Sequence, residues 1–253
     1  MTDPRSKKIP PAKEAAYIAL TCALLIGGQY VFSFVVGVEI VTLILVSFSC
    51  SFGARRGIIC ALAFSLLRCI IFPFSPTALI LYIIYYPALA AVFGGLGHIK
   101  KDGWAGTPVA VAVNLLLIAV CTACALCYAL DLIKISRIYK VTIEVLLWVV
   151  FSLSALGCIL FNILFILNKA GRNTAELLRI ISLTSVAAVC TVCFTLLDDI
   201  ITPLFYGYPP ETALAYFYAS FTAMLPQTVC TIVTVSTLFL PVTRLIEKYA
   251  LPH

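Results

Sequence analysis

The chain has 253 residues, 62% of them hydrophobic and 11% charged, with a mean hydropathy of +1.10. Soluble domains are about 45–50% apolar and about 25% charged, so this composition excludes a soluble globular protein. The net charge of +6 arises from Lys and Arg in short runs between apolar stretches, which is how membrane orientation is set, and does not indicate nucleic-acid binding. We therefore expect an all-α, polytopic helical bundle that forms a single transmembrane domain over residues 1–253.

Apolar stretches separated by Gly and Pro clusters predict about eight membrane-spanning helices. A helix needs about 17–25 predominantly apolar residues to cross a bilayer, and clusters such as Gly53–Gly57 and Pro73–Pro76 mark the joints. The predicted spans cover residues 15–36, 37–53, 57–73, 77–98, 106–130, 143–167, 179–203 and 214–242.

The distribution of basic residues predicts that both termini are cytoplasmic. With the N-terminal segment 1–14 inside, most Lys and Arg fall on the inner side, including Arg55 and Arg56 in the turn after the second span. The loop around Lys134 is a basic loop that this orientation places outside. We expect a multi-pass protein of the cell membrane.

Arg68 is a charged residue inside the third apolar segment. A charge at the centre of a spanning helix costs about 2.5–3.5 kcal/mol on the translocon scale, and an ionisable residue there is by default a candidate functional residue. The orientation places Arg68 in the outer part of the span. The alternative is that its long side chain extends to the outer headgroups.

Other polar side chains gather at the predicted depth of Arg68, which favours a cavity open to the outside. We expect Arg68 to donate to an anionic or hydrogen-bonding ligand, with Asp198 or Asp199 as its counter-charge or as partner for a cationic group. The helical spacing allows Tyr82 and one of Tyr85 and Tyr86 on one side. The candidate substrate-binding set is Gln29, Glu39, Arg68, Tyr82, Tyr85, Tyr86, Asp198, Asp199 and Gln227.

Each of these residues also has a simpler interpretation. The two aspartates can cap the end of the seventh span at the interface. Glu39 can be an interfacial residue at a helix N-terminus, where negative charge is favoured. The tyrosines can belong to an aromatic belt at the membrane surface.

The 11 cysteines and two histidines do not predict a metal or cofactor site. Cys121, Cys124 and Cys127 lie in an apolar helical stretch without acidic or His neighbours, which favours helix packing over metal binding.

Ala15, Ala19 and Ala23 are four residues apart and fall on one face of the first span. Such a ridge of small residues allows another helix to approach closely. That helix can belong to a partner or to this chain itself.

The chain resembles the substrate-binding (S) components of energy-coupling factor (ECF) transporters over roughly residues 12–100 and 179–246. The resemblance rests on the alanine face and on the stretches 38–43, 52–57, 195–202, 216–220 and 238–242. It implies that Ala15, Ala19 and Ala23 dock on the transmembrane scaffold subunit, that two ATPase subunits supply the energy, and that this chain captures a vitamin-like micronutrient and topples in the membrane to release it.

Two features depart from that family. Its members usually have six spans, so either residues 106–167 are an inserted hairpin or one of the predicted spans is interfacial. The outer loop between the first two spans is also very short. We expect no enzymatic activity, since the chain has no GxxxxGK[ST] phosphate-binding loop. The main alternative is a stand-alone secondary transporter for a small polar solute. Inverted repeats with broken mid-membrane helices would favour it, but the sequence has no internal repeat and the predicted polar groups are not at the midplane. A membrane hydrolase lacks its catalytic constellation, and Arg68 with the aspartate pair argues against a purely structural subunit.

Overall fold

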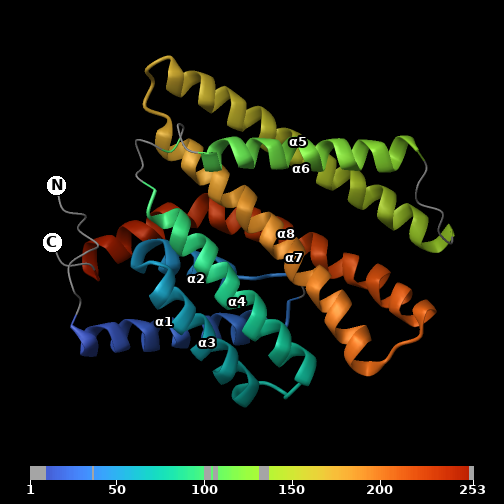
Figure 1. Ribbon diagram of the computed structural model, residues 1–253, viewed down its shortest axis with the longest axis horizontal. Helices are drawn as coiled ribbons and strands as arrows, with labels where there is room; N and C mark the ends of the chain where they lie inside the picture. Colours follow the sequence, from blue (N-terminus) through green and yellow to red (C-terminus); the bar gives the residue numbers. More distant parts are fainter. Residues whose placement is uncertain (1–9, 36, 100–103, 105–107, 131–136, 251–253) are drawn as a thin grey trace.

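The computed structural model describes residues 10–35, 37–99, 104, 108–130 and 137–250, and these residues form a bundle of helices (Figure 1). Within the described ranges there is no β-strand, so the predicted all-α class is confirmed there. The N-terminal residues 1–9 and the loop around Lys134 lie outside the described residues. The helices are α1 (Pro11–Phe32), α2 (Val41–Phe52), α3 (Ala54–Ile71), α4 (Pro76–Gly97), α5 (Pro108–Ala129), α6 (Arg137–Lys169), α7 (Ala175–Tyr206) and α8 (Pro210–Tyr249).

Six of these helices are long and apolar enough to cross a membrane: α1, α4, α5, α6, α7 and α8. They indicate a multi-pass membrane protein. The helix α3 has 18 residues and carries Arg55, Arg56 and Arg68, which reduce its hydropathy. The prediction of a spanning helix over 37–53 is wrong in its length, because α2 has 12 residues. Such a helix is about 18 Å long, whereas the hydrocarbon core is about 30 Å thick.

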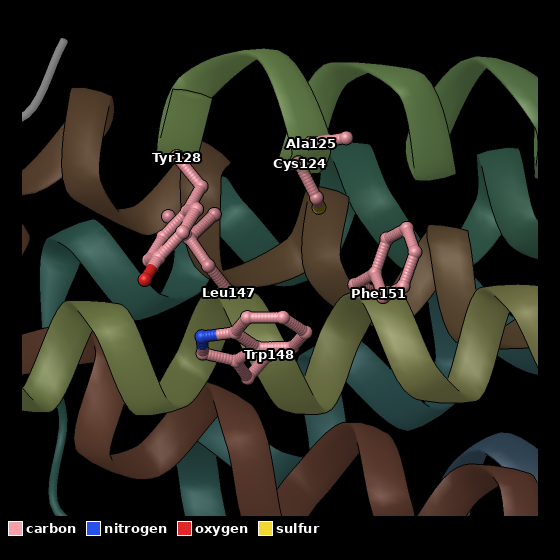
Figure 2. A pocket seen from close by; sticks show the side chains of 6 residues that line it. All are labelled: Cys124, Ala125, Tyr128, Leu147, Trp148 and Phe151. Atoms are coloured by element: carbon pink, nitrogen blue, oxygen red, sulfur yellow. The ribbon is translucent and has the colours of Figure 1, made fainter. Parts of the chain in front are cut away.

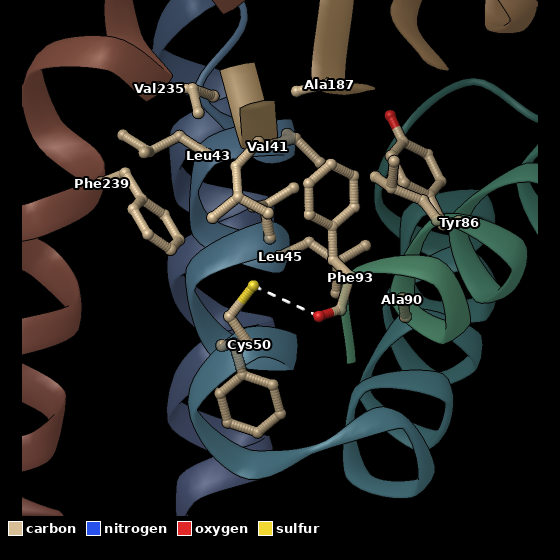
Figure 3. Close-up of a cluster of buried hydrophobic side chains, with 14 of the residues drawn as sticks. Val41, Leu43, Leu45, Cys50, Tyr86, Ala90, Phe93, Ala187, Val235 and Phe239 are labelled. Carbon is tan, nitrogen blue, oxygen red and sulfur yellow. Dashed lines mark hydrogen bonds between the residues drawn. The ribbon is translucent and has the colours of Figure 1, made fainter. Parts of the chain in front are cut away.

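The short helix α2 forms the centre of the bundle. All its residues except Ile44 are buried, and the helix packs mainly against α4 and α8, with α1 and α3 also in contact. Figure 3 shows Leu43 and Leu45 in this core, and it shows the Cys50 thiol donating to the carbonyl of Phe93 across 3.2 Å. The long apolar run of α2 is therefore explained by burial on all sides within protein.

Small residues bring α2, α3 and α4 into close contact. A Cβ added at Gly97 would collide with the backbone of Cys50, and one at Gly94 would collide with Ala54. The turn from α2 to α3 is made at Gly53, whose φ of 88° is a left-handed conformation that side chains disfavour. These contacts fix how the three helices lie relative to one another.

The helices α5 and α6 form a hairpin that packs on α7 at one side of the bundle, away from α1 and α3 (Figure 1). Asn114 and Asn162 hold the hairpin together with reciprocal amide hydrogen bonds of 3.3 and 3.1 Å. Residues expected as an inserted hairpin thus form a peripheral pair of helices, although residues 106 and 107 lie outside the described part of the chain.

The two ends of the bundle differ in their side chains. At what we call the Arg68 end, α1 and α3 end and α4 begins. At the opposite end, the Arg56 end, Glu14 forms an ion pair with Arg56 across 3.1 Å, and Glu176 forms one with Arg244 across 3.1 Å. Most of the described Lys and Arg lie toward the Arg56 end.

Candidate functional site

Arg68 lies in the last turn of α3, with its guanidinium over the ring of Tyr82 on α4. The guanidinium carbon is 4.5 Å from the Tyr82 ring centroid and 5.6 Å from that of Phe72. Such cation–π contacts contribute about 0.5–2 kcal/mol. Ser65 donates to the Tyr82 carbonyl across 3.0 Å, which holds α3 and α4 in this register. Arg68 therefore turns toward the bundle rather than extending away from it.

Gln29 reaches the same tyrosine from α1. Its side-chain amide Nε2 donates to the Tyr82 hydroxyl across 2.9 Å. Tyr82 is only 8% exposed, so its phenol connects α1 and α3 inside the protein. Gln29, Arg68 and Tyr82, which come from three predicted spans, thus lie in contact.

Polar atoms at this junction remain without hydrogen-bond partners. They are Nε and Nη1 of Arg68, which are donors, and Oε1 of Gln29, which is an acceptor, and all three atoms are buried. An unmade hydrogen bond at a buried group costs about 1–3 kcal/mol. A solute that accepts from Arg68 and donates to Gln29 would recover this cost.

All three tyrosines of α4 are buried and contact Phe194 of α7. The ring centroids of Tyr82, Tyr85 and Tyr86 lie 5.9, 4.8 and 6.0 Å from that of Phe194. The prediction that only one of Tyr85 and Tyr86 shares the side of Tyr82 is wrong, because all three rings contact the same side chain, Phe194. The burial also excludes an aromatic belt at the membrane surface, and makes these rings the aromatic wall beside Arg68.

Glu39 lies just before α2 and is partly buried against α8. Its backbone N–H donates to the thiol of Cys230 on α8 across 3.3 Å, and its carboxylate accepts from Thr42 across 2.9 Å. The Gln227 side chain also hydrogen-bonds this carboxylate. Glu39 and Gln227 therefore form a polar contact between the start of α2 and α8.

The segment that leads into α2 is not helical and is packed against α8. Gly37 has a φ of 85°, and a Cβ there would collide with Pro226. Backbone without helical hydrogen bonds is tolerated at membrane depth only where it is buried in protein or lines a cavity. In the segment 37–40, the thiol of Cys230 accepts from the Glu39 N–H and donates to the Glu39 carbonyl, so α8 supplies partners for this non-helical backbone.

Asp198 and Asp199 have partners other than the expected Arg68. Asp198 accepts from Thr202 and from Tyr216, each across 2.8 Å, and Asp199 accepts from Ser220 across 2.8 Å. No ion pair joins Arg68 to either aspartate, although all three are described residues. The aspartates face α8 at the end of α7 and form a group of their own.

Ala15, Ala19 and Ala23 are all exposed on α1. Gly27 continues their spacing of four residues, and a Cβ added at Gly27 would meet nothing within 4 Å. No described helix covers this ridge of small residues.

Two cavities lie away from Arg68. One, of about 130 Å³, is an apolar groove between α5 and α6, where the rings of Tyr128, Trp148 and Phe151 meet (Figure 2). The other, of about 340 Å³, lies at the Arg56 end and is lined by polar residues that the sequence interpretation left out, including Glu14 and His98. In the sequence, the feature that points to this second cavity is the basic turn between two glycines, residues 53–57.

Comparisons with protein-family models, with curated proteins and with solved structures find no match to this chain.

Proposed function

We propose that this protein captures a small polar solute at the junction of Arg68, Gln29 and Tyr82 and passes it across the membrane. The observation that carries the proposal is the set of buried, unpartnered atoms on Arg68 and Gln29, which lie around one buried phenol. A donor pair and an acceptor beside aromatic rings suit a ligand with an anionic group, an N–H or O–H donor and a flat ring.

The chemistry of Arg68 favours an anionic group on the solute. A guanidinium offers donors in a fixed fork that matches a carboxylate or a phosphate, and such charge-assisted bonds are stronger than neutral ones. Tyr82, Tyr85 and Tyr86 supply the aromatic wall, and Glu39 with Gln227 supplies acceptors on the far side. The class of solute is a vitamin-like micronutrient.

Within this function, the chain acts as the substrate-binding subunit of an ECF-type importer. The exposed ridge of Ala15, Ala19 and Ala23 supports this role, since it offers a partner helix a smooth surface. The scaffold subunit would dock there, and two ATPase subunits would hydrolyse ATP, so this chain is not itself an enzyme. The basic Arg56 end supports a cytoplasmic position for both termini, in the cell membrane.

A stand-alone secondary transporter is the second candidate, and one observation favours it. The short helix α2 follows the non-helical segment 37–40, in which Gly37 lies against Pro226 inside α8. Interrupted helices beside polar side chains are typical of solute sites in such transporters. In this case the exposed alanine ridge would face lipid.

The test is mass spectrometry of small molecules retained by the purified protein. Arg68→Ala is compared with Arg244→Ala, because Arg244 is an exposed arginine at the opposite end, paired with Glu176. We expect the wild type and Arg244→Ala to retain the same compound, and Arg68→Ala to lose it at least about tenfold. Equal retention by both variants would contradict the Arg68 site.

A further inference from the structure

The end of α7 contains a buried carboxylate oxygen and a buried hydroxyl that no side chain satisfies. Asp199 is 8% exposed and Thr195 is 7% exposed, and Oδ1 of Asp199 and Oγ1 of Thr195 have no hydrogen-bond partner. The two residues are four apart in α7, so they lie on the same face of the helix, one turn from each other. That face meets α8, because Ser220 of α8 donates to Oδ2 of Asp199.

The neighbouring aspartate differs in its contacts. Both carboxylate oxygens of Asp198 accept hydrogen bonds, one from Thr202 and one from Tyr216. Asp199 has a donor for only one of its two oxygens. Of these two adjacent acids, Asp199 is therefore the one with an incomplete set of hydrogen bonds.

The backbone adds a further oxygen at this position. Pro203 lies inside α7 and has no N–H, so the carbonyl of Asp199, four residues earlier, loses its helical donor. Neither aspartate forms an ion pair with a described Lys or Arg. The α7–α8 contact thus contains two adjacent carboxylates without a counter-ion, and it has oxygen atoms left to coordinate one.

We propose that Asp199 and Thr195 bind a small monovalent metal cation, of which sodium is the probe, between α7 and α8. One buried carboxylate with hydroxyl and carbonyl oxygens matches the charge and the hard-oxygen preference of such an ion. Divalent cations in all-protein sites use more carboxylates. The two unpartnered atoms are sealed from solvent, which fits a bare ion better than an organic solute.

This site goes beyond the proposed solute capture and does not depend on it, because it shares no contact with Arg68. A buried carboxylate without a partner is costly in a low-dielectric interior. A bound cation would remove that cost and hold α7 against α8. Its occupancy would therefore set the stability of the contact through Asp199 and Ser220.

The experiment uses the full purified chain in detergent, in sodium chloride or in N-methylglucamine chloride at equal ionic strength. We expect sodium to raise the melting temperature and radioactive sodium to bind. Asp199→Asn should weaken sodium binding at least about tenfold and abolish the shift in melting temperature. Asp198→Asn makes the same change of charge one residue away, and it should keep the sodium response.

A second variant and an infrared measurement also test the sodium site. If Asp199→Asn does not fold, Thr195→Val removes only the free hydroxyl and should also weaken sodium binding. A wild type that binds no radioactive sodium and whose melting temperature is the same with and without sodium would overturn the site. An infrared band of a protonated carboxylic acid that persists in sodium and disappears in Asp199→Asn would also overturn it, since a proton would then occupy the oxygen.

Discussion

The amide of Gln29 on α1 donates to the phenol of Tyr82 on α4 across 2.9 Å, while the guanidinium of Arg68 lies 4.5 Å from the centre of the same ring. Tyr82 thus positions the side chains of Gln29 and Arg68, which come from different helices. The hydroxyl contacts Gln29 and the ring contacts Arg68, so the contributions of the hydroxyl and of the ring to stability can be separated by mutation.

Tyr82→Phe removes the hydroxyl and keeps the ring, whereas Tyr82→Leu removes both. We expect Tyr82→Phe to cost about 1 kcal/mol of stability, through the bond to Gln29. Tyr82→Leu should cost about 3 kcal/mol or more, because it also leaves a cavity and removes the surface on which Arg68 lies. Thermal unfolding of the purified variants measures both. Equal losses would mean that the ring carries no part of the contact.

Gly97→Ala and Gly95→Ala make the same change two residues apart in α4. A methyl group at Gly97 would collide with the backbone of Cys50, while one at Gly95 meets nothing within 4 Å. We expect Gly97→Ala to lower the melting temperature, because α2 and α4 must separate. Gly95→Ala should be neutral or stabilising by up to about 1 kcal/mol, since Ala favours a helix over Gly. A neutral Gly97→Ala would contradict the close contact of α2 with α4.

Ala19→Leu tests the exposed ridge of α1. If the ECF-type partnership holds, the larger side chain should prevent close approach of a scaffold helix, so that scaffold and ATPase subunits no longer co-purify. Solute retention by the isolated chain should not change, since Ala19 is exposed and lies away from Arg68. Ala123→Leu, at an exposed alanine of α5, serves as the matched control. Continued co-purification with Ala19→Leu would show that the ridge is not the docking face.

The helices could be predicted from the sequence because their ends carry strong local signals. Pro76 opens α4 with Ser75 as its N-cap, Gly53 separates α2 from α3, and Gly207 ends α7 in a left-handed conformation. These signals act through φ and through missing N–H groups, which do not depend on the rest of the fold.

The length of α2 could not be predicted in the same way. Hydropathy does not distinguish a helix that crosses lipid from one that is buried on all sides by protein, and α2 is the second kind. Its first expected residues, 37–40, leave the helix because they pack against Pro226, which is 186 or more residues further along the chain. That contact is tertiary and has no local signal.

Gln29, Arg68 and Tyr82 lie in contact, whereas Asp198 and Asp199, expected in the same set, have their partners on α7 and α8. Asp198 and Asp199 look equivalent in sequence, yet adjacent residues of a helix point about 100° apart, so one is fully hydrogen-bonded and the other is not. Depth along a helix can be estimated from residue number, whereas the choice between facing α3 and facing α8 depends on how the helices rotate against each other.

The shortness of α2 has an electrical consequence for the proposed solute capture. Glu39 precedes a helix of 12 residues, about 18 Å long, whereas a hydrocarbon core is about 30 Å thick. If the Gly53 end of α2 lies at the inner edge of that core, a charged solute that reached Glu39 from the Arg68 end would have crossed about two fifths of the transmembrane voltage. Because a full crossing is worth about 2.3 kcal/mol per charge at 100 mV, this partial crossing is worth about 1 kcal/mol. The affinity for an anion should thus vary with membrane potential, whereas the affinity for a neutral ligand of the same shape should not change.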